Sequence, residues 1–365
     1  MALKVGIVGL PNVGKSTLFN AITNSKVEAA NYPFATIEPN VGVVEVPDKR
    51  IDFLAEKFGS KKILRTTIEF VDIAGLIAGA SKGEGLGNAF LANIRETDAI
   101  CEVVRCFDDK DITHVEGSVD PIRDIQIINL ELMYADEATI DKRMAKVLPK
   151  VKSNTDKDAK AEYALLEKCK QTLTDGKLLN TLELSDEENK ILKGFQLLTA
   201  KPFIYVANVG DDDLAEDNKY VKEVRQFAEE NNAKVVKICA KIEEDLTEAS
   251  DEEKREFLKD LGANQTGLDE LIQVAYQTLG LITYFTAGPQ EARAWQIKQG
   301  WTAPQAAGAI HTDFEKGFIK ADVYSYADFE KLGSEKAVKD AGKMRLEGKG
   351  YVVEDGDVCF FKFNR

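Results

Sequence analysis

The segment Gly9-Leu10-Pro11-Asn12-Val13-Gly14-Lys15-Ser16 decides how the first part of the chain folds. It fits the pattern G-x-x-x-x-G-K-[ST], follows a strand-like run at Val5–Val8, and leads into a helix-like run at Thr17–Ile22. The glycines allow backbone N–H groups to surround phosphate oxygens, and the following helix presents its positive end to the same place. The segment therefore predicts a strand, a phosphate-binding loop and a helix.

The side chains of this loop have separate predicted roles. Lys15 is expected to reach the β- and γ-phosphate oxygens, and the hydroxyl of Ser16 is expected to bind Mg²⁺. The predicted nucleotide contacts in the loop are Asn12, Val13, Gly14, Lys15, Ser16 and Thr17.

Short apolar runs bounded by turn residues recur along the chain and alternate with helix-like stretches. They predict buried strands at 68–73, 100–104, 203–207 and 235–238. Strands that alternate with helices form βαβ units, so the fold class is α/β with a mostly parallel sheet.

A second phosphate-sensing element is Asp72-Ile73-Ala74-Gly75, which fits D-x-x-G at the end of a predicted strand. Asp72 is expected to hold Mg²⁺ and the Gly75 N–H to sense the γ-phosphate. Thr36 lies between the two motifs and fits a threonine that completes the Mg²⁺ coordination. The glycine-rich tract 80–87 that follows is expected to act as a switch segment.

Base recognition is expected after two later strands. Asn208-Val209-Gly210-Asp211 is similar to the N-K-x-D element of GTPases, with Val209 in place of the lysine that covers the base. Cys239-Ala240-Lys241 takes the place of the S-A-K loop. The predicted base contacts are Asn208, Val209, Asp211, Cys239 and Ala240. The acid-rich run 243–260 just beyond predicts a solvated helix face, with Ser250 as a helix cap.

The interval between Asp72 and Asn208 spans 136 residues, whereas a βαβ unit needs about 30. Apolar residues at helical spacing within 140–151 and 166–173 predict two helices joined near 153–156, with Pro149 kinking or ending the first. After Leu281 the chain turns to aromatics, glycine and short alternating segments. We therefore expect a nucleotide-binding domain at 1–120 and 199–280, an inserted helical domain at 121–198, and a small β-rich domain at 281–365.

Composition narrows the class of protein and its expected location. The chain has 48 basic and 62 acidic side chains and a net charge of −14, which disfavours a nucleic-acid binder, although residues 281–365 carry 12 of each sign. Its five cysteines have no C-x-x-C spacing, so neither a disulfide framework nor a zinc site is expected. The sequence lacks a long apolar run and a signal-peptide pattern, which favours a cytoplasmic protein without a membrane partner.

Several longer strings resemble the YchF family, the Obg-like ATPases of the TRAFAC class. They are 9–17, Asn31-Tyr32-Pro33-Phe34-Ala35-Thr36-Ile37-Glu38-Pro39-Asn40, 72–76, 81–87, 284–288 and 310–318, and the match runs nearly end to end. The resemblance implies that the last domain is a TGS domain with a ubiquitin-like β-grasp fold. It also implies an ATPase that associates with the ribosome, with the large subunit and RNA as expected contacts of the helical and TGS domains, and a cytoplasmic monomer.

Two features leave alternatives open. The family usually has Glu at the last position of its base element, and Asp211 could accept hydrogen bonds from guanine, so a GTPase of the same fold is the alternative to an ATPase. A ribosome- or RNA-binding module with incidental hydrolysis is a further alternative. The predicted catalytic set is His114, Lys15 and Gly75, because Leu76 stands where GTPases often have a glutamine and His114 is the family's candidate substitute. Asn12 matches an asparagine that binds K⁺ in potassium-activated relatives, so K⁺ is a second candidate ion.

Overall fold

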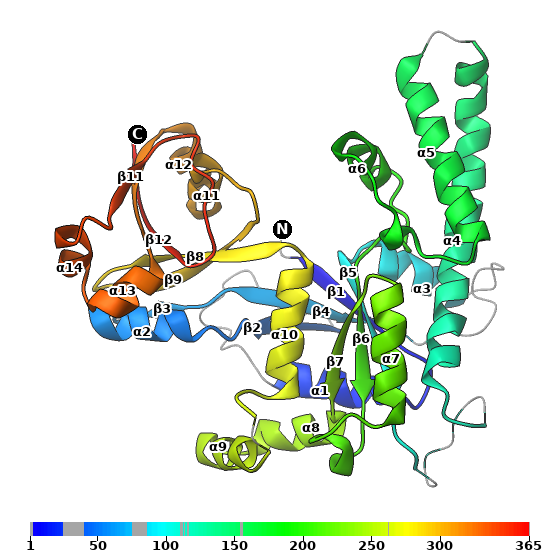
Figure 1. Cartoon of the computed structure of the whole chain (residues 1–365), viewed down its shortest axis with the longest axis horizontal. Helices are drawn as coiled ribbons and strands as arrows, with labels where there is room; N and C mark the ends of the chain where they lie inside the picture. Colours follow the sequence, from blue (N-terminus) through cyan, green and yellow to red (C-terminus); the bar gives the residue numbers. More distant parts are fainter. Residues whose placement is uncertain are drawn as a thin grey trace. The chain divides into compact units, whose positions relative to one another are not determined.

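The computed structural model describes residues 3–24, 40–74, 86–109, 112, 114, 117–153, 156–261 and 263–364. These residues form two compact units. The first contains the described residues within Met1–Lys26, Thr36–Val43 and Glu69–Ala275, and the second those within Val27–Ala35, Val44–Ile68 and Tyr276–Arg365 (Figure 1). The division of the chain into three domains remains a prediction.

The sheet of the first unit has the strand order β2-β4-β1-β5-β6-β7. Its strands are β1 (Lys4–Val8), β2 (Val41–Glu45), β4 (Thr67–Asp72), β5 (Ala99–Arg105), β6 (Phe203–Asn208) and β7 (Lys234–Ile238). The pairs β1–β4, β1–β5, β5–β6 and β6–β7 are all parallel, which confirms the predicted α/β class. Every residue of β5 and β6 is buried, as expected for strands covered on both faces.

Helices lie between these strands along the chain. They are α1 (Lys15–Asn24), α3 (Leu86–Arg95), α7 (Lys219–Glu230), α8 (Ala240–Glu248), α9 (Asp251–Asp260) and α10 (Gly267–Thr278), with a short 3₁₀ turn η4 (Asp211–Asp213) after β6. Ser250 and Glu253 form the capping box that begins α9, so that predicted cap is confirmed. The carboxyl ends of the parallel strands carry the predicted functional segments.

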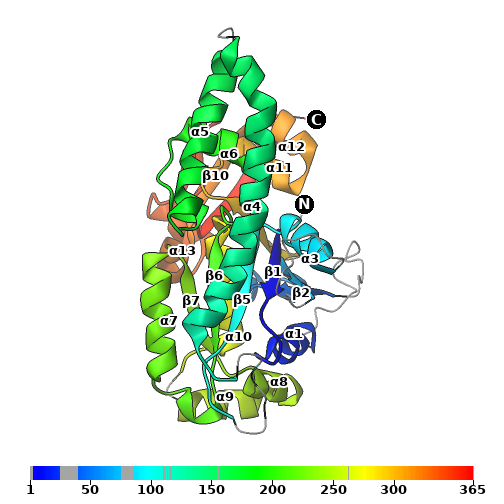
Figure 2. The same cartoon turned by 90° about the vertical axis from the view of Figure 1, so that its right-hand side faces the viewer.

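The inserted segment is a helical hairpin of α4 (Pro121–Lys152) and α5 (Lys157–Thr174), followed by η3 (Leu179–Thr181) and α6 (Asp186–Lys193) (Figure 1). Helix α4 also packs against β5 and α7 (Figure 2). The expectation that Pro149 ends or kinks the first helix was wrong about the end, because α4 continues to Lys152. Pro149 falls in the last turn, where little helix remains for its missing N–H to disrupt.

The second unit has its own six-stranded sheet in the order β11-β10-β12-β8-β9-β3. The strands are β3 (Ile63–Leu64), β8 (Leu281–Ala287), β9 (Ala292–Lys298), β10 (Phe318–Ser325), β11 (Arg345–Glu347) and β12 (Asp357–Phe363). The helices are α2 (Lys49–Phe58), α11 (Ala303–Ile310), α12 (Thr312–Lys316), α13 (Tyr326–Leu332) and α14 (Glu335–Asp340). Pairs β8–β9, β10–β12 and β10–β11 are antiparallel, whereas β12–β8 and β3–β9 are parallel.

Residues 44–68 therefore contribute α2 and β3 to the second unit, although the sequence placed them in the nucleotide-binding domain. Their apolar faces explain this position: Ile51 and Leu54 are buried in one core with Phe285 and Phe329. No helix within the described ranges is long and apolar enough to cross a membrane.

Candidate nucleotide-binding site

The phosphate-binding loop lies between β1 and α1, as the sequence predicts. Asn12 and Gly14 both have left-handed backbone conformations, with φ of 63° and 95°. A Cβ atom added at Gly14 would lie 2.1 Å from the side-chain nitrogen of Asn208, so this position requires glycine for space as well as for φ. The loop is thus shaped by its backbone and closed on one side by β6.

Lys15 and Asp72 meet at the mouth of this loop. The Lys15 Nζ lies 2.5 Å from Asp72 Oδ1, and both side chains are largely buried. One group begins α1 and the other ends β4, so the fold brings together a cation suited to phosphate and a carboxylate suited to a metal ion. The oxygen donors of Ser16 and Asp72 fit Mg²⁺, which prefers a few protein oxygens together with phosphate and water.

Asn208 connects the phosphate loop to the second base-recognition segment. Its Nδ2 donates to the Val13 carbonyl at 2.8 Å, and its Oδ1 accepts from the Ala240 N–H at 3.0 Å. The side chain is buried. Asn208 therefore braces three segments that are distant in sequence, a role that its place in an N-x-x-D motif alone did not indicate.

Asp211 faces solvent next to the Cys239–Lys241 segment. Its side chain is 56% exposed, accepts from the Cys239 thiol at 3.3 Å and lies 3.8 Å from Lys241 Nζ. Burial raises the pKa of the Cys239 thiol to about 11, so the thiol stays protonated and can donate to this carboxylate. Val209 is buried, so its side chain cannot cover a base as a lysine would.

Glu243 is a buried carboxylate that sequence reasoning assigned to a solvated helix face. Only 7% of the residue is exposed, and its Oε1 accepts from the Gly267 N–H at 2.8 Å, at the start of α10. A Cβ at Gly267 would lie 2.6 Å from the Ile238 side chain. Burial raises the pKa of Glu243 to about 7. The long-range contact with α10 left no local signal in the acid-rich run.

His114, the predicted catalytic base, lies at the start of the inserted domain. The residue is 9% exposed, and its Nε2 lies 2.8 Å from Oδ2 of the buried Asp124 in the first turn of α4. Arg123 also contacts Asp124, at 3.0 Å. The sequence predicted a polar loop here, and the carboxylate that fixes the imidazole was missed.

Three predicted features lie outside the described residues: Thr36, Gly75 and most of the glycine-rich tract 80–87. The other predicted groups converge at the carboxyl ends of β1, β4, β6 and β7. The predicted structural role of the second histidine fits its position, because His311 Nδ1 accepts from the Asp313 N–H at the start of α12.

Comparison with known proteins agrees with this geometry. Residues 4–143 match the family MMR_HSR1, described as "50S ribosome-binding GTPase", and residues 281–364 match YchF-GTPase_C, described as "Protein of unknown function (DUF933)". Over the whole length of both chains, the protein is 54% identical to the "Ribosome-binding ATPase YchF" of Bacillus subtilis (strain 168). The chain belongs to the YchF family. The protein of the same name from Escherichia coli O157:H7 is 55% identical, again with both chains fully covered.

A solved YchF structure has the same overall fold. The "Schizosaccharomyces pombe YchF GTPase" superposes with a TM-score of 0.89 at 44% identity, covering 99% of this chain and 97% of that one. This YchF chain is thus a P-loop nucleoside triphosphatase. The bacterial names specify an ATPase and the yeast title a GTPase, which makes the base-recognition segments the point to resolve.

Proposed function

We propose that the protein is a Mg²⁺-dependent ATPase of the cytoplasm that acts as a nucleotide-controlled switch on the ribosome. The observation that carries this proposal is the convergence of Lys15, Asp72 and Asn208 around one backbone-shaped phosphate loop. The names of its YchF relatives, which specify ribosome binding and ATP hydrolysis, support it.

Base preference rests on Val209 and Asp211. A buried Val209 cannot stack over a base in the manner of the GTPase lysine, which favours ATP. The exposed Asp211 carboxylate can accept from guanine N1–H and N2–H, which favours the GTPase alternative. Competition between ATP and GTP for the purified protein separates the two, and tighter binding of GTP would reject the ATPase proposal.

An Asp211→Asn variant sharpens that test. The amide keeps the size of the side chain but can donate where the carboxylate only accepts, so GTP binding is expected to weaken more than ATP binding. Lys222→Ala, an exposed change on α7, is the matched control and should leave both affinities unchanged.

In the proposed hydrolysis, Lys15 contacts the β- and γ-phosphate oxygens while Ser16 and Asp72 hold Mg²⁺. The metal, when bound, neutralises charge that develops on the phosphates. His114 orients the attacking water, and Asp124 fixes the ring that does so. Asn12, on the exposed side of the loop, is proposed to place K⁺ beside the phosphates.

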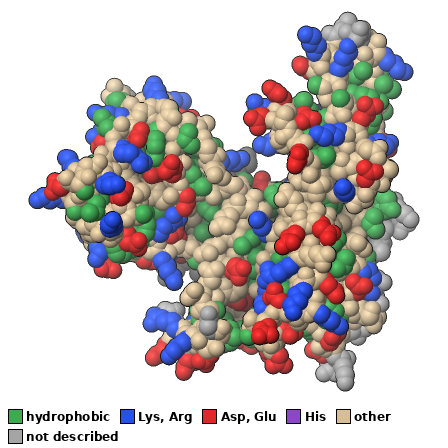
Figure 3. Space-filling view, viewed as in Figure 1, with side chains coloured by type: hydrophobic (Ala, Val, Ile, Leu, Met, Phe, Trp, Pro, Cys, Tyr) green, Lys and Arg blue, Asp and Glu red, His purple; other side chains and the backbone are tan. Residues whose placement is uncertain are grey.

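The free end of the α4–α5 hairpin is the proposed ribosomal RNA contact, on the large subunit. Lys and Arg side chains gather there (Figure 3), among them the exposed Lys150, Lys152 and Lys157. Clustered lysines bind phosphate backbones even on a protein whose net charge is −14. The TGS domain is proposed as a second contact, and the protein is proposed to bind as a monomer.

Sedimentation with separated ribosomal subunits tests this contact. Charge reversal of Lys150, Lys152 and Lys157 to Glu is expected to abolish co-sedimentation with large subunits. Reversal of three exposed lysines elsewhere in the first unit, Lys222, Lys234 and Lys259, is the matched control. Unchanged binding by the hairpin variant would reject the RNA contact.

The alternative of a binding module is separated by Lys15→Ala. Loss of nucleotide-stimulated ribosome binding together with hydrolysis supports a switch. Full ribosome binding without hydrolysis, independent of added ATP, would instead establish a docking protein with incidental hydrolysis.

A further inference from the structure

The loop that leads from β5 to His114 is held from within by a buried arginine. Arg105, the last residue of β5, is 1% exposed. Its three guanidinium nitrogens donate to the carbonyl oxygens of Phe107, Asp109 and Ile112 at 3.0–3.1 Å. Its guanidinium carbon also lies 4.7 Å from the centre of the Phe107 ring. A buried charge is costly unless it is hydrogen-bonded, so these carbonyls keep the loop in one shape.

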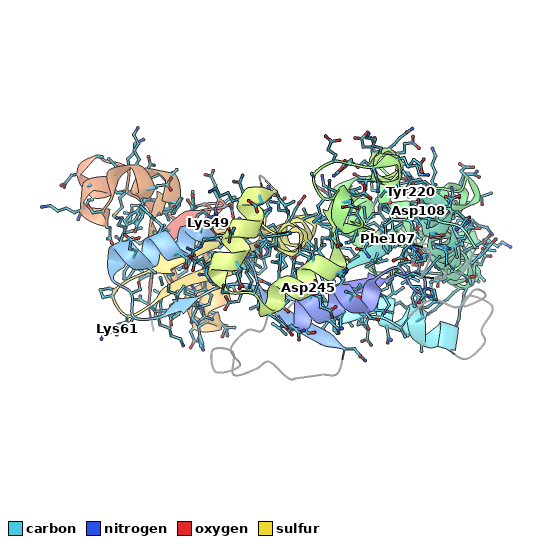
Figure 4. All side chains as sticks on the ribbon, turned by 90° about the horizontal axis from the view of Figure 1, so that it is seen from below. Lys49, Lys61, Phe107, Asp108, Tyr220 and Asp245 are labelled. Carbon is cyan, nitrogen blue, oxygen red and sulfur yellow. The ribbon has the colours of Figure 1, made fainter. Side chains whose placement is uncertain are left out.

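The same loop is held from outside by the first residues of α7. Asn218 Nδ2 donates to the Cys106 carbonyl at 2.8 Å, and the Tyr220 hydroxyl donates to the Asp108 carboxylate at 3.1 Å. Figure 4 shows Tyr220, Asp108 and Phe107 side by side. These contacts join residues 112 positions apart in sequence.

Asn218 also contacts the base-recognition segment. Its Nδ2 lies 2.8 Å from Asp213 Oδ2, in the 3₁₀ turn that contains Asp211. The Cys106 N–H donates to the Asn208 carbonyl at 2.8 Å, so a backbone contact runs beside the side-chain one. The amide oxygen of Asn218 accepts from the Val221 N–H at 3.0 Å and caps α7.

One connected set of hydrogen bonds therefore runs from the segment 208–213, through Asn218, to the loop held by Arg105. The chain then reaches His114, whose ring is fixed by Asp124. An amide that bridges two segments holds them at a fixed separation, so a shift in one alters the position of the other.

We propose that Asn218 is a positioning residue that couples base recognition at 208–213 to the loop carrying His114, so that turnover depends on the bound base. This inference rests on the proposed role of His114 in hydrolysis. The base then contributes to kcat through the protein, in addition to its contribution to affinity.

Asn218→Asp is the variant that tests this coupling. Aspartate keeps the acceptor that caps α7, since Asp and Asn cap helices about equally, but removes the donor to Cys106 and opposes Asp213. We expect kcat for ATP to fall about tenfold, with ATP affinity and the midpoint of thermal unfolding close to wild type. The ratio of kcat for ATP to kcat for UTP, measured at saturation, should fall toward one. Equal wild-type kcat values for the two nucleotides, or an unchanged ratio in the variant, would overturn the coupling.

Asp213→Ala is the second variant if Asn218→Asp fails to fold. It removes the contact with the base segment and leaves both the α7 cap and the Cys106 contact in place, so the same fall in the ATP-to-UTP ratio is expected. An unchanged ratio would overturn the coupling here as well.

The double variant Asn218→Asp/His114→Ala separates this inference from the proposed function. If Asn218 acts through His114, the Asn218→Asp change lowers kcat much less in the His114→Ala background than in wild type. An equal fall in both backgrounds overturns the coupling. Wild-type kcat in His114→Ala alone would reject the role of His114 instead.

Discussion

The phosphate loop at 9–16 and the segment from Arg105 to Asp124 are built in opposite ways. In the loop, backbone conformations at Asn12 and Gly14 create the site, and the motif encodes them locally. Between Arg105 and Asp124, side chains from β5, α4 and α7 hold the chain in place. The comparison teaches that nucleotide binding and turnover depend on different kinds of contact and should be separable by mutation.

The largest expected effect is on turnover. His114→Ala removes the group proposed to orient water, a contribution that is typically about 10²–10⁴-fold. We expect kcat to fall by that order while ATP affinity stays near wild type, the pattern of an interaction made mainly in the transition state. Steady-state kinetics together with direct ATP binding measure both quantities. Wild-type kcat would remove His114 from the mechanism.

A smaller effect is expected on affinity from the phosphate loop. Gly14→Ala combines a left-handed φ with a Cβ 2.1 Å from Asn208, so ATP affinity is expected to fall about 100-fold. Gly59→Ala is the matched control, because Gly59 has φ of 61° and no neighbour within 4 Å. It should cost about 1 kcal/mol of stability and leave ATP binding intact. Equal behaviour of the two variants would contradict the steric argument.

Stability should depend on pH through Glu243. Its pKa is about 7 in the folded chain and about 4.5 when unfolded, so the folded state binds more protons between these values. Stability from this group is full below about pH 4.5 and declines as pH rises to about 7, by roughly 3 kcal/mol. Denaturant unfolding of wild type and Glu243→Gln should differ in pH dependence by this amount. Parallel curves would show that Glu243 does not titrate in this range.

The smallest expected effect concerns the monovalent ion. If Asn12 places K⁺ beside the phosphates, ATP hydrolysis in KCl should exceed that in NaCl about two- to fivefold at matched ionic strength. Asn12→Ala should remove the difference. Equal rates for wild type in the two salts would leave Asn12 with the role of shaping the loop alone.

The sequence predicted the parts of this molecule whose signals are local. The phosphate loop, Asp72 at the end of β4 and the capping box of Ser250 each depend on a few adjacent residues, and each was found. Glu243 looked like part of a solvated face because its partner, the Gly267 N–H, lies 24 residues away. Likewise, nothing near Asn218 in the sequence indicates Cys106, and the α2 segment gave no sign of its core with Phe329.

The central claim, that a nucleotide binds through the loop at 9–16, is tested most directly by the ATP affinity of Lys15→Ala, measured by calorimetry. The substitution removes charge-assisted hydrogen bonds to phosphate, each worth about 1.5–3 kcal/mol. Lys222→Ala serves as the control for loss of one positive charge on the surface. The account predicts ATP binding weakened about 100-fold or more in Lys15→Ala. Wild-type affinity in that variant would contradict the assignment of the phosphate site.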